Sequence, residues 1–368
     1  MKILLIMLTF FVQPIVWLGL LRSGLIIRSR LKRTRQQFNT AVYEEFYELR
    51  HFWLGTLFLG ILLSAVSWLV EISLPLNWIV WYELLTGINL LLVPWFFLPV
   101  TIAMISTFGI MMTDSILKPN YLIVMSLIIM TLGLWIEVNG GRFNVPRIFR
   151  NRRSNQVAGY PFNELSIVPM LVMIPGNLIR HYLAFYPTFQ INGHLVSFML
   201  LPIFLGLRLT VFKHLPRLIF KRLGNRLAFL GIAGAVLAIV SFRWPILVPV
   251  SLVGLLLLTW LVIFSAKRTD LKDGKWCSKA VNGVRVVGIE PHTPADRMNL
   301  RVGDLIMNVN HYPVASENEF YKALQSRATY CKLRVMNTNN RIILTETAIF
   351  NDSPHDVGVV LFRDRNKQ

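Results

Sequence analysis

The chain has 368 residues, of which 54% are hydrophobic and only 15% are charged, and its formal net charge is +19. Soluble domains carry roughly 25% charged residues, so the composition excludes an ordinary soluble protein. The positive charge does not indicate nucleic-acid binding, because most of it lies in short segments between apolar runs, where basic residues set membrane orientation.

Apolar runs of about 18–20 residues recur through residues 1–265, and each is long enough to cross a hydrocarbon core of about 30 Å. The first run follows a single lysine and has no small-residue cleavage site, so we interpret it as an uncleaved anchor. We predict a polytopic α-helical membrane domain of seven to nine spans over residues 1–265. The candidate spans are residues 3–21, 52–70, 77–93, 95–113, 121–138, 164–183, 195–212, 227–242 and 245–264.

The segment after the first run, residues 22–51, combines basic charge with an apolar stripe. Its apolar residues recur at three- and four-residue multiples, its first half is basic, and its second half contains three glutamates. This spacing predicts a basic amphipathic helix in the cytosol. Two interpretations remain open, since the charge either only sets orientation or also holds the helix on anionic lipid or a partner helix.

Basic residues are concentrated in some connections and almost absent from others. They follow the first, fifth, seventh and last spans, whereas the other connections carry almost none. Because basic loops stay cytoplasmic, we expect a multi-pass protein of the cell membrane with its N-terminus outside and its C-terminus inside. Residues 77–113 form a hairpin broken near Pro94 and Pro99, a re-entrant pair or one long helix, and only the first two keep this orientation consistent.

No motif for catalysis or cofactor binding is present in the sequence. HExxH, GxSxG and the Walker A phosphate loop are all absent. The two cysteines, Cys277 and Cys331, have neither metal-ligand spacing nor a disulfide framework. We therefore expect a protein that is not an enzyme and that carries no metal or cofactor.

The remainder of the chain has the composition of a soluble domain. We divide it into a linker at 266–274, an α+β domain at 275–363 and a tail at 364–368. The predicted order is a strand at 284–289, a short helix beginning at Thr293–Pro294, a strand at 305–310, a helix capped by Ser316 and a hairpin.

The central part of this domain resembles a bacterial PDZ domain. The matching segments are 291–295, 298–300, 302–304 and 309–311, which correspond to PGSPA, AGL, VGD and VNG of that family. The chain departs from the pattern at His292, Asn299 and His311, where the family favours glycine. Because Asn and His are among the residues that best tolerate left-handed backbone, we expect these turns to persist.

PDZ domains bind extended peptides by adding a strand to a sheet edge beside a helix. The best match to the family's carboxylate-binding loop is residues 356–359, near the end of the chain, which implies a circularly permuted domain. The residues that the resemblance assigns to peptide binding are Val357, Gly358, Val359, Val360, Phe320 and Leu324. The alternative is that residues 357–362 are simply a core strand.

The whole arrangement, a polytopic membrane part, a basic segment after the first span and a C-terminal PDZ-like domain, resembles the MinJ family of cell-division topology proteins of rod-shaped Gram-positive bacteria. That family acts as an adaptor between the pole and septum protein DivIVA and the division inhibitor MinD. The resemblance implies a membrane scaffold at septum and poles with DivIVA-like and MinD-like partners, besides membrane lipid, and self-association stays open. Two alternatives are a regulatory PDZ subunit of a membrane protease or signalling complex, and a transporter or lipid enzyme with an appended PDZ domain.

Overall fold

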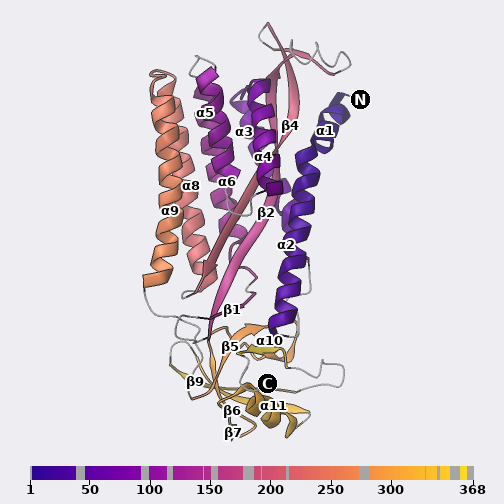
Figure 1. Cartoon of the computed structure of the whole chain (residues 1–368), viewed down its shortest axis with the longest axis vertical. Coiled ribbons are helices and arrows are strands. Elements are labelled where there is room, and N and C mark those ends of the chain that lie inside the picture. The colour runs from indigo at the N-terminus through magenta and orange to yellow at the C-terminus, as the bar shows by residue number, and fades with distance from the viewer. Residues whose placement is uncertain are drawn as a thin grey trace.

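The computed structural model has a tall part of helices and strands with a small sheet domain at one end (Figure 1). Residue 356 of the predicted loop and residues 338–339 of the predicted hairpin turn lie outside the described residues. The structure describes residues 2–38, 46–92, 99–113, 119–143, 145–150, 156–176, 186–191, 193–212, 215–272, 282–327, 329–337, 340–348 and 357–362.

Helices make up most of the tall part: α1 (Lys2–Val12), α2 (Pro14–Phe38), α3 (Tyr47–Leu69), α4 (Leu76–Leu92), α5 (Pro99–Thr113), α6 (Pro119–Asn139), α8 (Pro216–Ser241) and α9 (Leu247–Lys272). Among the described residues, α3, α6, α8 and α9 are long and apolar enough to cross a membrane. The pair α1 and α2, bent by 51° at Pro14, is a fifth candidate, while α4 and most of α5 are shorter apolar helices. By length and composition, the described helices therefore support four or five spanning helices, fewer than the seven to nine predicted spans.

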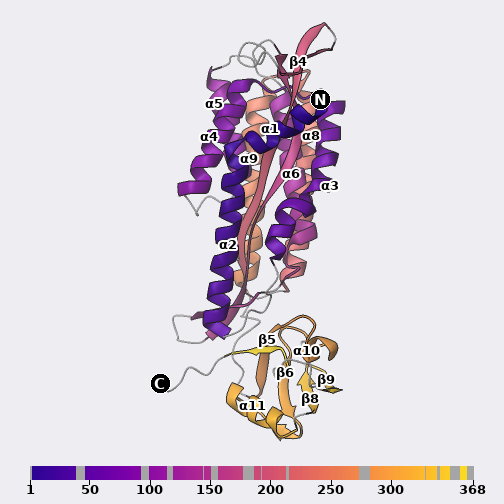
Figure 2. The ribbon, with the colours of Figure 1, turned by 90° about the vertical axis from the view of Figure 1, so that its right-hand side faces the viewer.

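Two of the predicted helical spans are strands. The predicted helices at 164–183 and 195–212 are, over their described residues, the strands β2 (Gln156–Pro175) and β4 (His194–Val211). Residues 177–183 of the first predicted span lie outside the described residues. The two strands pair antiparallel without interruption from Tyr160↔Val211 to Pro175↔Val196, a length of roughly 50 Å at ~3.3 Å per residue. This ribbon runs the height of the tall part (Figures 1 and 2) and exceeds the ~30 Å of a hydrocarbon core. The short strands β1 (Arg147–Arg150) and β3 (Phe189–Ile191) extend it in the order β1-β2-β4-β3.

Prolines explain why these two segments are not helical. Pro161, Pro169 and Pro175 lie within β2, and Pro202 of β4 lies directly opposite Pro169. A proline inside a helix removes a backbone hydrogen bond and clashes with the preceding turn, at a cost of about 3 kcal/mol, whereas strand edges and bulges accommodate it. Hydropathy cannot separate the two structures, because an apolar run fits a buried strand as well as a buried helix.

The outer edge of β2 finds hydrogen-bond partners on α3. The Thr56 hydroxyl donates to the Ile167 carbonyl at 2.5 Å, and the Ser64 hydroxyl accepts the Leu171 N–H at 3.0 Å. The turn after α3 continues this pairing through both backbone groups of Met173. Backbone groups at membrane depth need partners inside the protein, and α3 supplies them along this edge.

The outer edge of β4 is bonded in the same way by α1, α2 and α4. The Gln13 amide, at the break between α1 and α2, donates to the Leu200 carbonyl at 2.7 Å. The Tyr82 hydroxyl of α4 donates to the Pro202 carbonyl at 3.2 Å and accepts the Phe204 N–H at 3.1 Å. Side chains of the helices thus take the place of further strands on both sides of the ribbon.

Helix α6 lies at the centre of the tall part. The protein buries 78% of the most apolar 18-residue stretch of α6, whereas it buries only 28–33% of the corresponding stretches of α3, α8 and α9. Helix α6 packs on α8 through glycines. A Cβ added to Gly224 would lie 2.6 Å from the Gly133 carbonyl oxygen, and one added to Gly231 would lie 2.6 Å from the Met130 backbone nitrogen. Small residues at these positions let the two helices approach closely.

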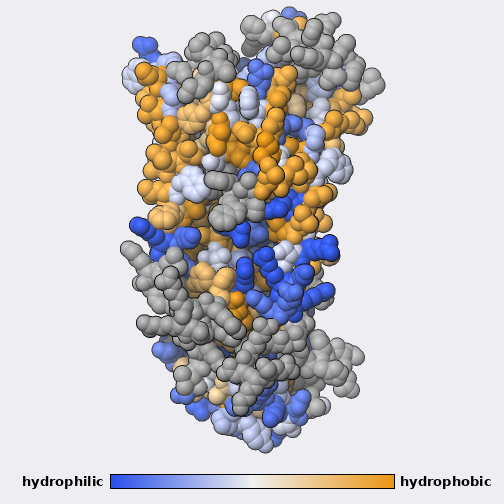
Figure 3. Space-filling model, in the orientation of Figure 1, coloured by the Kyte–Doolittle hydropathy of each residue, from blue (hydrophilic) through white to orange (hydrophobic). Residues whose placement is uncertain are grey.

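Exposed apolar side chains form a belt around the tall part. Phe58 is 73% exposed and Leu69 80%, and other exposed apolar residues lie on α1, α8 and α9. Figure 3 shows this belt and, directly below it toward the sheet domain, a zone of hydrophilic residues. Contiguous apolar surface of this extent is rare on soluble monomers, and it fits a membrane-embedded domain.

The C-terminal domain contains a sheet of strands in the order β10-β5-β6-β8-β9, with β7 beside β6 (Figure 2). The predicted strand, short helix, strand, helix and hairpin all occur in that order. Its core is separate from that of the tall part and includes Val286, Ile306, Phe320 and Leu333. Its elements are β5 (Val284–Ile289), α10 (Pro294–Arg297), β6 (Leu305–Val309), β7 (Tyr312–Pro313), α11 (Glu317–Gln325), β8 (Tyr330–Met336), β9 (Ile342–Ala348) and β10 (Val359–Leu361).

Helix α9 continues to Lys272, so residues 266–272 of the predicted linker are helical. Asp270 in this stretch is buried, and its carboxylate accepts the Phe212 N–H at 2.7 Å, which fixes the end of α9 to the end of β4. Lys267 and Arg268 therefore mark where α9 leaves the apolar belt. The helix itself continues to Lys272.

Candidate functional site

The residues predicted to bind a peptide come from the end of the chain and from α11, and four of them lie in the core of the C-terminal domain. Their side chains are buried, each between 1% and 6% exposed. Val357, Val359, Phe320 and Leu324 share one core. Since these side chains are buried in the core, main-chain groups are the part of this site that a peptide can contact.

The main chain of β10 lies at one edge of the sheet, where it pairs with β5 and no described strand pairs with its other edge. The Glu290 N–H donates to the Gly358 carbonyl at 2.9 Å, and Val359 lies opposite Ile289. Bonded and non-bonded positions alternate in an antiparallel pair, so the N–H and C=O of Val359 face away from β5. This edge has the geometry that strand addition requires.

Gly358 has a conformation and surroundings that only glycine fits. Its φ is +81°, and an added Cβ would lie 2.2 Å from the Thr293 hydroxyl oxygen. That hydroxyl donates to the Glu290 carbonyl at 2.6 Å, and the Ala295 N–H donates to the Val357 carbonyl at 2.9 Å. The turn at 291–295, one of the segments that match the PDZ pattern, therefore holds the described part of the predicted loop in place.

Helix α11 is fixed at its start and on its inner face. The Ser316 hydroxyl accepts the Glu319 N–H at 3.2 Å, which confirms the predicted cap. The Asn310 side chain donates to the Ala323 carbonyl at 3.2 Å and accepts the Lys332 N–H at 3.0 Å. Asn310 thus joins α11 to β8 and keeps the helix in register with the sheet.

The three positions where the chain lacks the PDZ-like glycines have left-handed backbone. The φ angles are 63° at His292, 53° at Asn299 and 77° at His311. The expectation that these turns persist without glycine is confirmed, at the modest cost that left-handed Asn and His carry.

The C-terminal domain is docked on the lower end of the ribbon, a contact that the sequence reasoning missed. The Tyr160 hydroxyl of β2 donates to the Val287 carbonyl of β5 at 2.8 Å, and both groups are buried. Ala158 and Phe362 complete a small apolar cluster between the two parts. The sequence holds no local signal for this contact, because residues 139–163 are interpretable there only as a basic loop.

Two buried polar contacts join α2, α3 and β2 above this junction. Arg30 of α2 bonds Glu48 of α3 at 2.5 and 3.1 Å, and His51 of α3 contacts Glu164 of β2 at 3.1 Å. Among the described residues, no three His, Cys, Asp or Glu side chains gather in a way that could hold a metal ion. We infer that the first contact fixes α2 to α3 and that the second fixes α3 to the ribbon.

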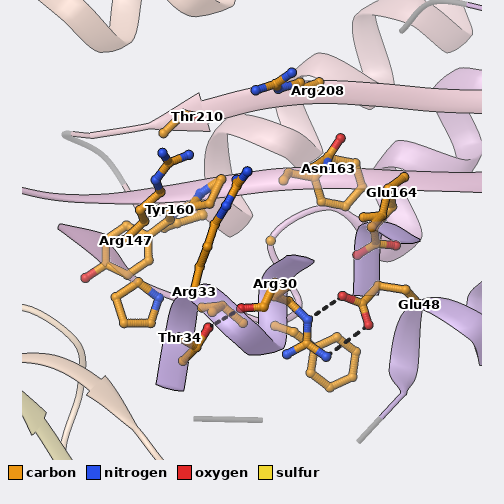
Figure 4. A pocket seen from close by; sticks show the side chains of 18 of the residues that line it. Arg30, Arg33, Thr34, Glu48, Arg147, Tyr160, Asn163, Glu164, Arg208 and Thr210 are labelled. Atoms are coloured by element: carbon orange, nitrogen blue, oxygen red, sulfur yellow. Dashed lines mark hydrogen bonds and ion pairs between the residues drawn. The ribbon is translucent and has the colours of Figure 1, made fainter. Parts of the chain in front are cut away.

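A cavity of about 110 Å³ opens beside these contacts (Figure 4). Arg33 of α2, Arg147 of β1 and Arg208 of β4 line one end of it. Burial lowers the pKa of Arg147, and the charges of Arg33 and Arg208 lower it further. The fold therefore concentrates positive charge from three distant segments at one place, which no sequence motif signals.

The described part of the predicted amphipathic segment 22–51 forms the lower half of α2 and the start of α3. A shallow groove of about 810 Å³ runs between them, lined by Ile27, Leu31, Phe46 and Leu49 with Arg28, Lys32 and Arg35 beside them. The predicted apolar stripe thus faces this groove in part, and the basic side chains lie along it.

Comparison with known proteins finds relatives that cover nearly the whole chain, although no family model matches it. The chain is 25% identical over 96% of its length to a Bacillus subtilis (strain 168) protein named cell division topological determinant MinJ, of which the alignment covers 94%. It is 27% identical over 95% of its length to proteins of Lacticaseibacillus paracasei and Lacticaseibacillus casei (strain BD-II), each named probable cell division topological determinant MinJ and each 95% covered. The similarity therefore includes both the tall part and the C-terminal domain.

Proposed function

Since full-length similarity makes this chain a MinJ-type protein, we propose that it acts in cell division as a membrane-anchored adaptor for division-site selection. The observation that carries the proposal is that the similarity covers an apolar, membrane-type part and a separate C-terminal domain in one chain. An adaptor needs both, one part to hold it in the membrane and another to bind a partner. The role we propose is non-catalytic.

The distribution of charge supports a cytoplasmic C-terminal domain. Hydrophilic residues gather below the apolar belt, at the end of the tall part where the C-terminal domain lies (Figure 3). The lower half of α2, which ends there, carries several basic residues, among them Arg28, Lys32, Arg33 and Arg35. Helix α1 lies toward the opposite end (Figure 1). Because basic segments stay on the cytoplasmic side, this arrangement favours a multi-pass protein whose C-terminal domain faces the cytosol.

For the binding mode, we propose strand addition of a partner peptide to β10, beside α11. The open edge at Val359 and the fixed turn at Gly358 support this mode, which is that of PDZ domains. By resemblance to the MinJ family, the expected partners are DivIVA-like and MinD-like proteins, with enrichment at septum and poles.

Localisation in dividing cells tests the proposed role. A fluorescent fusion of the full chain, expressed at native level, should concentrate at septa and poles. A multi-pass membrane protein without a division role, expressed to the same level, controls for the extra membrane at a septum. Uniform signal along the membrane, equal to that of the control, would count against the proposal.

A further inference from the structure

Strand β10, which carries the proposed peptide edge, receives little support from its own sheet. It has three residues, and among the described strands β5 is the one with which it pairs. The register of this pairing also shifts between Val360 and Leu361. A strand with so few ladder hydrogen bonds opens easily unless other contacts hold it. Those other contacts therefore decide whether a peptide meets a formed edge.

The register shift places Val287 of β5 in a bulge. The residues of β5 on either side of it lie opposite Val360 and Leu361, so Val287 itself has no counterpart among the three residues of β10. The extra residue of a bulge is left out of the ladder, and its buried polar groups need other partners. The Val287 carbonyl has its partner in the tall part, because it accepts the Tyr160 hydroxyl of β2 at 2.8 Å. The tall part thus supplies a hydrogen bond at the point where the pairing of β10 shifts.

Side chains on β10 and directly after it pack against two different parts of the protein. Val359 and Leu361 lie in the core of the C-terminal domain. Phe362, which follows β10 directly and is 4% exposed, shares an apolar cluster with Ala158 and Tyr160 of the ribbon. Figure 2 shows β5, the neighbour of β10, on the side of the domain nearest the tall part. The end of β10 is therefore anchored by the ribbon as well as by its own domain.

The base of the ribbon makes one more close contact with this pair of strands. A Cβ added to Gly288 would lie 3.2 Å from the ring of Pro146 and 3.3 Å from the Cβ of Val360, so the glycine lets Pro146 approach the sheet. Pro146 directly precedes β1, where the Ile148 N–H donates to the Gln37 side chain of α2 at 3.2 Å. The surface that supports β10 is thus fixed to a long helix of the tall part.

These contacts support the edge without occupying it. They are made by side chains on a face of the sheet and by the carbonyl of the bulge residue on β5. A peptide would instead add in the plane of the sheet, along the main chain of Val359. Docking of the domain and addition of a peptide are therefore geometrically compatible.

We propose that the base of the ribbon is a positioning surface for the peptide edge, with Ala158 and Tyr160 as positioning residues, so that β10 is fully formed only while the C-terminal domain is docked. The use of this edge rests on the strand addition proposed above, whereas the state of β10 does not. Because coupling between two equilibria is reciprocal, a peptide bound at β10 would also hold the domain against the tall part.

Hydrogen–deuterium exchange of the full chain in detergent, measured by mass spectrometry, tests the proposal. Ala158→Glu places a carboxylate in the buried cluster and should undock the domain. We expect amide exchange at Val359–Leu361 to rise by roughly tenfold or more, because β10 can then open without disrupting the cluster. The amides of β8, in the middle of the sheet, should keep their protection. Since no partner is added, the result does not depend on the adaptor role.

Two further substitutions make the test specific. Ala158→Ser keeps a small side chain at the same position and should leave exchange at β10 close to that of the unchanged protein. Tyr160→Phe keeps the ring and loses only the bond to the Val287 carbonyl, so it should raise exchange at β10 by about a few-fold. This milder variant also covers the case in which Ala158→Glu fails to fold.

Two results would overturn the proposal. An equal rise in exchange at β8 and β10 would show that the substitutions destabilise the whole domain and do not act on the edge. Exchange at β10 that is the same in Ala158→Glu, in Tyr160→Phe and in the unchanged protein would show that the ribbon does not hold this strand.

Discussion

Cys331 lies in the core of the C-terminal domain, with no exposed surface and no disulfide partner. Burial raises the pKa of its thiol to about 12. Because the thiolate is the reactive form, we expect Cys331 to resist maleimide at pH 8 in a Cys277→Ser variant of the full chain. Labelling should become complete once the domain is unfolded, and rapid labelling of the folded protein would show that this core is open.

The same thiol makes the stability of the C-terminal domain depend on pH. The pKa of a cysteine in an unfolded chain is about 8.5. Above this pH the unfolded state therefore loses a proton that the folded state keeps. The stabilisation that the neutral Cys331 thiol gives the folded state is therefore complete below about pH 8.5. This stabilisation declines as the pH rises toward about 12. Denaturant midpoints at pH 7.5 and pH 10 should differ more for the unchanged protein than for Cys331→Val. Equal differences would contradict the buried neutral thiol.

Single residues show what the sequence can and cannot predict about the candidate site. Left-handed backbone at His292, Asn299 and His311 could be predicted, because it depends on local turn chemistry. The requirement for glycine at position 358 has a second cause that is not local, since Thr293 fills the space where a Cβ would be. Burial of the predicted peptide-contacting side chains is likewise a property of the folded core.

At the scale of elements, the close contact of α6 and α8 depends on glycine. Gly224 is in backbone contact with Gly133, so Gly224→Leu should force the helices apart and sharply lower the melting temperature and yield of the protein in detergent. Gly254→Leu in α9 is the matched control, because nothing lies within 4 Å of a Cβ added there. Equal effects of the two substitutions would contradict this packing.

Two single proline substitutions in the edge strand β10, both at buried valines, test strand addition. Val359 directs its N–H away from β5, so Val359→Pro should remove a bond to an added peptide while the sheet keeps its pairing. Val360→Pro, one position on, should instead break the bond to β5 and lower the melting temperature. Partner binding by the full chain, measured beside its melting curve, separates the two effects. Unchanged binding by a folded Val359→Pro variant would place the peptide site elsewhere.

The ribbon of β2 and β4 is the element that the sequence predicted least well. Its two segments pass the length and hydropathy test for membrane helices, and within the predicted spans it is Pro169, Pro175 and Pro202 that argue against helix. The partners that make a buried ribbon tolerable, such as Thr56 and Tyr82, come from other helices. Their role follows from tertiary packing, so a scan along the chain cannot reveal it.

At the scale of the whole molecule, the C-terminal domain is held against the tall part. The Tyr160–Val287 hydrogen bond and the cluster with Phe362 place β5 and the end of β10 at the base of the ribbon. The long helix α9 leads down to the same region and is fixed there by Asp270. A partner bound at β10 would therefore sit at a defined distance below the apolar belt, which suits an adaptor that presents proteins at the membrane surface.

Recruitment of a protein partner to the membrane by the C-terminal domain can be tested with a truncated chain. Removal of residues 273–368 leaves α9 and its Asp270 contact complete, so residues 1–272 should still insert in the membrane at normal level. The measurement is the fraction of a MinD-like partner that is found on the membrane in cells with each form. We expect the full chain to recruit the partner and residues 1–272 to leave it in the cytosol. Full recruitment by residues 1–272 would show that the C-terminal domain is not the recruiting part.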